Sequence, residues 1–154
     1  MMQVLGIRTA PATIRYAVLN WDGTTASLIN ADTENKLDFP ADCQSIEQKL
    51  SWLYQELKRV LRQHADIETI VVKANEYGRG AEKAASREAA YFDAVALLVA
   101  GERRIPVEMR LYRAIGTKRT EVKAFARTNV GATISHWNEQ MADAIAAAWS
   151  GKGT

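Results

Sequence analysis

The residues with the clearest chemistry are positively charged side chains in the second half of the chain. From Glu102 to Arg127 the sequence has eight arginines and lysines but only three glutamates. The eight are Arg103, Arg104, Arg110, Arg113, Lys118, Arg119, Lys123 and Arg127. Guanidinium and ammonium groups neutralise phosphates and give binding that weakens with salt. If several of them share one face, they predict a nucleic-acid contact surface; a solvated basic face is the alternative.

A second candidate lies in the segment NEYGRGAEK, residues 75–83. Gly78 and Gly80 permit close approach of the backbone, and Arg79 and Lys83 could hold a phosphate or an acidic partner. The glycine spacing and the Lys-Ser/Thr pair of a Walker motif are absent. The alternative is a turn that precedes a helix.

Composition bounds the class of protein. The chain has 154 residues, 47% of them hydrophobic and 25% charged, which predicts a single domain over 1–154 with a frayed tail at 151–154. A net charge of +2 does not by itself indicate nucleic acid. The single cysteine, Cys43, excludes an intramolecular disulfide and a thiolate zinc site. With no apolar run of about 18 residues and no secretion signal, we expect a cytoplasmic protein without a membrane span.

Five segments carry the apolar patterns of strands. Side chains alternate between apolar and polar in the second segment, and an Asp-Gly turn that favours a tight hairpin follows it. A β-branched run marks the fourth as a central, buried strand. The five are residues 4–8, 12–20, 26–30, 68–74 and 105–112. The polar stretch 31–44 is predicted to be a connector.

Four segments have the spacing of helices. Ser45 and Gln48 form a capping box before the first, and Gly101 is predicted to stop the second. The four are residues 45–61, 81–100, a short helix within 113–131, and 137–149. In chain order the elements predict an α/β fold. Its five-stranded mixed sheet combines a three-stranded antiparallel meander with parallel strands, and helices cover both faces.

This order of elements resembles the ribonuclease-H-like fold, and short motifs along nearly the whole chain resemble the RuvC group of Holliday-junction nucleases. In that group the first strand reads apolar-Gly-Ile-Asp, where this chain has LGIR at 5–8. YAV at 16–18 is similar to the Tyr-Gly-Val triplet of the next strand, and VVKANE at 71–76 is similar to a strand that ends in a carboxylate. IGTK at 115–118 and QMADA at 140–144 are similar to the group's basic turn and its Asp-x-x-Asp-Ala helix.

The resemblance implies a site for two Mg²⁺ ions built from carboxylates on the first strand, the fourth strand and the last helix. The matching residues are Arg8, Lys73, Gln140 and Asp143, and only Asp143 is a carboxylate. Mg²⁺ needs oxygen ligands and is repelled by cations, so we expect a degenerate site without metal or cofactor. Asp143 is expected to pair with Arg8 or Lys73, because such a pair removes the repulsion among carboxylates that lack their metal.

A rearranged set of carboxylates is the alternative. Glu76 lies three residues after Lys73, Asp22 lies on the first hairpin turn, and Glu139 precedes Gln140. Together with a carboxylate on the last helix they could hold Mg²⁺, and the chain would then be a metal-dependent nuclease. As solvated surface carboxylates they would hold no metal.

Three functions from different classes follow. The first, which we favour, is a catalytically inactive pseudo-nuclease that binds DNA, RNA or a protein partner through a basic surface. Its predicted contacts are Arg79, Lys83, Arg113, Lys118, Arg119, Lys123 and Arg127. The second is a divalent-metal-dependent nuclease, and the third is a structural or homo-oligomeric module without a ligand. The sequence names neither a substrate nor a pathway.

Overall fold

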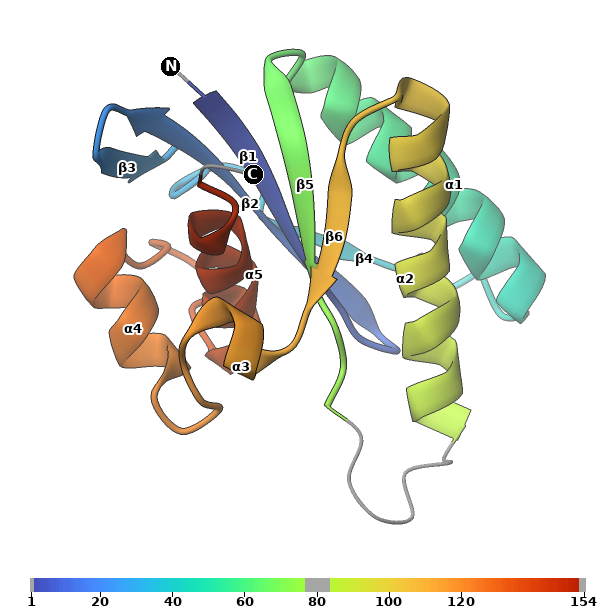
Figure 1. The fold of residues 1–154 in the computed structure, drawn as a ribbon. Coiled ribbons are helices and arrows are strands. Elements are labelled where there is room, and N and C mark those ends of the chain that lie inside the picture. The colour runs from blue at the N-terminus through green and yellow to red at the C-terminus, as the bar shows by residue number, and fades with distance from the viewer. Residues whose placement is uncertain (1, 77–83, 153–154) are drawn as a thin grey trace.

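The computed structural model describes residues 2–76 and 84–152. Within them six strands form one mixed sheet (Figure 1). The strands are β1 (Met2–Thr9), β2 (Thr13–Asp22), β3 (Thr25–Leu28), β4 (Lys36–Asp38), β5 (Ile67–Lys73) and β6 (Val107–Arg110). The sheet order is β3-β2-β1-β5-β6, with β4 paired to β2 beside this path. β1 is antiparallel to β2 and parallel to β5, which confirms the predicted meander joined to parallel strands.

Helices cover both faces of the sheet (Figure 1). They are α1 (Ile46–Gln63), α2 (Ala84–Arg103), α3 (Tyr112–Ile115), α4 (Val122–Asn129) and α5 (Glu139–Ser150). α1 and α2 enclose one apolar core, and α4 and α5 enclose a second core on the opposite face. The predicted capping box of Ser45 and Gln48 is present at the start of α1. Within the described ranges no helix is long and apolar enough to cross a membrane.

The contact between β1 and α5 is close because both elements carry small residues there. A Cβ atom placed on Gly6 would lie 2.0 Å from the carbonyl oxygen of Ala144, so only glycine fits at this point of β1. Alanines of α5 make up much of the core on this face. The packing holds Asp143, the residue before Ala144, against the end of β1 that carries Arg8.

The segment 31–44 is more regular than predicted. Lys36–Asp38 forms β4, which pairs antiparallel with Thr13–Arg15 of β2. β3 pairs only with the last four residues of β2, so the first part of β2 has backbone groups that still need partners. β4 pairs with Thr13–Arg15, and Asn30 and Asn35 bond to the backbone of Tyr16 and Val18, so the sheet has six strands instead of five.

Two further boundaries differ from the predicted ones. The sequence predicts a stop at Gly101, but α2 continues two residues further and ends where Arg104 adopts a φ of 57°. The strand predicted over 105–112 is limited to Val107–Arg110, because Tyr112 already begins α3.

The C-terminal residues are packed as far as Lys152. Gly151 is buried, and a Cβ atom on it would lie 2.8 Å from Cγ1 of Val4. The ammonium of Lys152 lies 4.7 Å from the ring centre of Trp21. Of the predicted frayed tail, Gly151 is thus packed and Lys152 is exposed, and residues 153–154 lie outside the described part.

Candidate functional site

The carboxyl-terminal ends of β1 and β5, together with α5, bring three of the predicted site residues together. These strands are parallel neighbours, with Ile7 opposite Val72, so Arg8 and Lys73 emerge side by side. α5 supplies Asp143 from one face of the sheet. The sequence places these residues far apart, and the parallel pairing joins them.

Asp143 is fully buried and both of its carboxylate oxygens accept hydrogen bonds. Oδ2 accepts from Nε of Arg8 at 2.9 Å, and Oδ1 accepts from the hydroxyl of Tyr112 at 2.7 Å. Burial raises the pKa of Asp143, and the Tyr112 hydroxyl and the Arg8 guanidinium oppose that rise. Burial and the Asp143 carboxylate together raise the pKa of Tyr112. The predicted contact between Asp143 and a cation is present, and Arg8 supplies it.

Arg8 also links Asp143 to a second buried carboxylate. Its Nη1 atom donates to Oδ1 of Asn75 at 2.6 Å, and Nδ2 of Asn75 lies 3.4 Å from Oδ2 of Asp93 on α2. The hydroxyl of Thr9 donates to the other oxygen of Asp93 at 2.5 Å. Burial raises the pKa of Asp93, although the Thr9 hydrogen bond opposes it. A polar network therefore crosses the end of the sheet from α5 to α2.

The sequence analysis missed Asp93, Asn75 and the role of Tyr112. A signal for Asp93 exists, because it is the one charged residue among the inward-facing residues of α2. A buried carboxylate needs hydrogen-bond partners, so its place on that stripe indicates a polar neighbour. Which neighbour it is depends on how α2 packs across the strand ends.

Lys73 is the most buried cation of the site, with a side chain that is 1% exposed. Its ammonium donates to the carbonyl of Ala74, lies 3.9 Å from the ring centre of Tyr112 and 3.7 Å from Oε1 of Glu76. Burial lowers the pKa of Lys73, and the carboxylates of Asp143 and Glu76 oppose that change. Neutral groups therefore surround much of this positive charge.

A cavity of about 310 Å³ opens beside these residues. Its lining includes three of the predicted positions, Arg8, Lys73 and Gln140. The full lining is Arg8, Lys73, Asn75, Glu76, Tyr112, Arg119, Glu139 and Gln140. The lining has three cations and two carboxylates, so the cavity is polar and its charges largely offset one another.

The residues at this centre do not fit a two-metal site. Mg²⁺ needs several oxygen ligands with free lone pairs. Both oxygens of Asp143 are already hydrogen bonded, and the charged groups of Arg8 and Lys73 stand where the resemblance places two other carboxylates. In the residues that the structure describes, no group of three or more His, Cys, Asp or Glu side chains could hold a metal ion.

The alternative carboxylates do not assemble into a cluster around Asp143. Glu76 and Glu139 line the cavity, but both are engaged elsewhere. Glu76 accepts the backbone N–H of Tyr112 at 2.8 Å, and Glu139 accepts from Nε of Arg119 at 2.8 Å. Asp22 lies at the opposite end of the sheet from Arg8, because the antiparallel pairing places the end of β2 beside the start of β1.

Five of the predicted nucleic-acid contacts are exposed on neighbouring elements. They are Arg113 on α3, Lys118 and Arg119 in the following turn, and Lys123 and Arg127 on α4. α3 and α4 lie on the same side of the sheet as α5 (Figure 1). Arg119 lines the cavity, and the guanidinium of Arg127 lies 5.3 Å from the ring centre of Trp137. We call these five residues the α3–α4 basic surface.

The other basic residues do not extend this surface. Arg103 lies near the start of β5, at the other end of the sheet, and Arg104 follows it. Arg110 is partly buried and pairs with a neighbouring glutamate at 2.7 Å. Arg79 and Lys83 lie outside the described residues.

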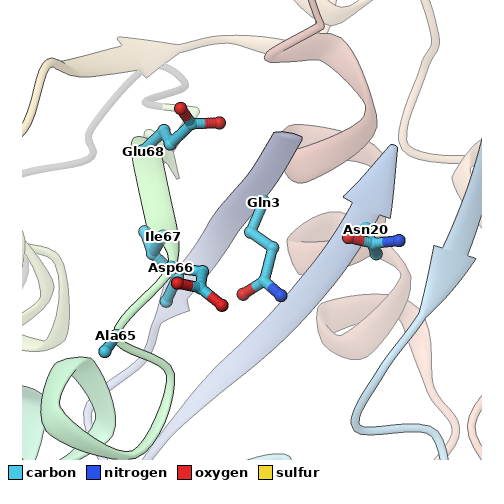
Figure 2. A pocket seen from close by; sticks show the side chains of 6 residues that line it. All are labelled: Gln3, Asn20, Ala65, Asp66, Ile67 and Glu68. Carbon is cyan, nitrogen blue, oxygen red and sulfur yellow. The ribbon is translucent and has the colours of Figure 1, made fainter. Parts of the chain in front are cut away.

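A larger cavity, of about 430 Å³, lies at the opposite end of the sheet (Figure 2). Its lining is Gln3, Asn20, Ala65, Asp66, Ile67 and Glu68. Figure 2 shows the amide of Gln3 and the carboxylate of Asp66 turned toward each other. The lining has two carboxylates and no cation, so this cavity offers little to a phosphate.

Comparison with solved structures identifies the fold. Thermus thermophilus RuvC superposes with a TM-score of 0.77 over 97% of this chain and 92% of its own, at 18% sequence identity. The same protein in complex with a Holliday junction substrate gives a TM-score of 0.76. The yeast mitochondrial Holliday junction resolvase Ydc2 gives 0.62 over 97% of this chain and 78% of its own, at 12% identity.

This chain has a ribonuclease-H-like fold. The predicted fold class is thereby confirmed, together with the resemblance to the RuvC group on which it partly rested. No family model matches the sequence, and no curated protein sequence matches it. At these identities the likeness establishes the fold, and the chemistry has to come from the chain's own residues.

Proposed function

We propose that this chain is a nucleic-acid-binding domain in which two-metal cleavage by the ribonuclease-H-like fold has been lost. The observation that carries this proposal is the buried pair of Asp143 and Arg8. The guanidinium supplies the positive charge that metal ions would otherwise supply. It occupies its position permanently and cannot activate water as a bound metal does.

The α3–α4 basic surface supports the binding half of the proposal. Its five cations are exposed, so their charge is available to phosphates, and one of them lines the cavity. Trp137 beneath Arg127 adds an aromatic group beside these cations. The RuvC structure in complex with a Holliday junction substrate shows that this fold accepts branched DNA in another protein.

The test measures, by fluorescence anisotropy over a salt series, how tightly the protein binds labelled four-way and single-stranded DNA. We expect an affinity that falls with salt. The slope of log affinity against log salt concentration counts the phosphate contacts. Lys123→Gln and Arg127→Gln should each make that slope shallower by roughly 0.9 for duplex arms, the value for one lost phosphate contact. Arg62→Gln is the matched control, because Arg62 is exposed on α1 across the sheet. Salt-independent or absent binding would contradict the proposal.

Cleavage of the same DNA in Mg²⁺ or Mn²⁺ tests the alternative function. We expect no product from the wild-type chain. Product that disappears in Asp143→Asn would establish a metal-dependent nuclease with a rearranged carboxylate set, and the proposed loss of cleavage would then be wrong.

We also propose a second copy of the chain as a protein partner, bound through the outer face of α2. Tyr91, Leu97 and Leu98 on this face are 47%, 37% and 54% exposed. A face with so many large apolar side chains marks an interaction site. Both ends of α2 carry charges of both signs, Arg87 and Glu88 at the start and Glu102 and Arg103 at the end, so an antiparallel pair of α2 helices can pair opposite charges at each end.

Size-exclusion chromatography with light scattering tests this association. We expect a dimer, and a monomer for Leu98→Glu with an unchanged melting temperature. A wild-type chain that stays monomeric at high concentration would contradict the proposed partner.

We further propose that the protein is cytoplasmic, since Cys43 is a free thiol with no disulfide partner in the sequence.

A further inference from the structure

The carboxylate of Glu76 occupies a position that suits an anion. Its Oε1 atom accepts the backbone N–H of Tyr112 at 2.8 Å and lies 3.7 Å from Nζ of Lys73. The side chain of Glu76 is 43% exposed, whereas that of Lys73 is 1% exposed. A carboxylate at the surface therefore reaches inward to a buried ammonium.

Two carboxylates offset the buried charge of Lys73, first Asp143 and then Glu76, and only Glu76 is exposed enough to be exchanged for a ligand. The ammonium donates to the carbonyl of Ala74 and faces the ring of Tyr112. Asp143 is bonded to another cation. A buried ammonium without a counter-charge is costly, so an anion that replaces Glu76 must itself reach Lys73.

The second ion pair of the cavity is loosely held. Arg119 and Glu139 lie 2.8 Å apart, but their side chains are 77% and 41% exposed. Water and salt screen such a pair, so Arg119 can turn from Glu139 to a ligand at little cost. Two carboxylates of the chain, Glu76 and Glu139, thus engage two cations that line one cavity.

We propose that a phosphodiester group displaces the Glu76 carboxylate and binds to Lys73 and Arg119. Glu76 is then an internal competitor of the nucleic acid. A phosphate oxygen suits this position because it accepts hydrogen bonds from ammonium, guanidinium and backbone N–H groups. The inference rests on the nucleic-acid binding proposed above, and adds a subsite and a residue that limits its affinity.

The experiment compares Glu76→Gln with the wild-type chain in anisotropy titrations of a short fluorescein-labelled single-stranded DNA. Glutamine keeps an oxygen for the N–H of Tyr112 and removes the charge. We expect tighter binding by roughly fivefold, the factor for the attraction between two opposite unit charges about 4 Å apart in water, which the phosphate no longer has to overcome. Adding Arg119→Gln to this variant should reverse much of the gain, and because Arg119 is exposed the double variant should fold.

Glu68→Gln is the matched control, because Glu68 is an exposed glutamate near the other end of β5. It makes the same change in net charge and should leave affinity nearly unchanged. Equal tightening by both variants would mean a general charge effect and would overturn the subsite. If Glu76→Gln and the wild type bind with equal affinity, Glu76 is not a competitor of the nucleic acid, and the proposed nucleic-acid binding itself still stands. If neither the wild type nor Glu76→Gln binds at low salt, both proposals fail.

Discussion

Two arginine–carboxylate pairs lie in the same site and differ mainly in their exposure to water. Arg8 and Asp143 are 2.9 Å apart with side chains 16% and 0% exposed. Arg119 and Glu139 are 2.8 Å apart with side chains 77% and 41% exposed. The nitrogen–oxygen distances alone would predict that the two pairs contribute equally to stability. Their surroundings give them different roles. Breaking the Arg8–Asp143 pair should destabilise the fold, whereas the Arg119–Glu139 pair can be replaced by contacts to a ligand.

The difference follows from the cost of an unpaired charge. If Arg8 or Asp143 loses its partner, the remaining charge stays in a poorly solvated place, and that cost is several kcal/mol. If Arg119 or Glu139 loses its partner, water solvates the remaining charge. The buried pair is therefore expected to resist any ligand, whereas the exposed pair can yield to one.

The largest expected effect is that of Asp143→Ala. It leaves Arg8 without its carboxylate and should lower the free energy of unfolding by about 3–5 kcal/mol. Urea denaturation followed by circular dichroism measures this change. An unchanged melting temperature would mean that the buried pair contributes nothing and would erase the contrast with the exposed pair.

A smaller effect is expected when both members of the buried pair are replaced together. Arg8→Met with Asp143→Leu removes both charges, so neither is left uncompensated. The double variant should lose less stability than Asp143→Ala alone, and the double-mutant cycle should show a coupling of about 0.5–3 kcal/mol. Purely additive losses would contradict direct coupling.

The pH dependence of Asp93→Asn comes next. Burial holds the folded-state pKa of Asp93 above its ordinary value of 3.8, so its contribution to stability is present below that value and is lost as the pH rises through the folded-state pKa. The variant should therefore gain stability relative to wild type as the pH rises from the ordinary value of 3.8 through the folded-state pKa of Asp93. Thermal melts over that range measure the trend.

Asp38→Asn serves as the control of opposite sign. The Thr13 hydrogen bond and the neighbouring Lys36 lower the pKa of Asp38, so its contribution is present above the ordinary value and is lost as the pH falls. Parallel pH profiles for the two variants would contradict the assignment of Asp93 as the buried, unfavourably charged group.

The smallest effect belongs to the exposed pair. Glu139→Gln removes the partner of Arg119, yet the melting temperature should stay unchanged because water replaces the contact. A clear drop, comparable to that of Asp143→Ala, would show that the two pairs are equivalent after all.

The site residues that could be predicted from the sequence are those that lie at the ends of recognisable strands or in a recognisable helix. Arg8 ends an apolar run and Lys73 ends a β-branched run, and the resemblance to the RuvC group placed both in one site. The parallel pairing of β1 and β5 puts them at the same end of the sheet. Asp143 was expected to meet one of them, and it does. Asn75 belongs to no local pattern, and the helical period marks Asp93 as inward-facing without indicating its partner. Their hydrogen bonds join segments that meet only after α2 packs on the sheet.

The amino-acid sequence alone determined the alternation of strands and helices, the inward faces of the helices, and the basic residues Arg8 and Lys73 at the ends of two strands. These properties depend on residue types and on periods of two and about 3.6 residues, which the chain carries locally. Only the tertiary structure decided which cation meets Asp143, that β4 completes the edge of β2, and that Glu76 turns toward Lys73. Those outcomes depend on burial and on backbone groups that come together across the fold, and no local spacing encodes them.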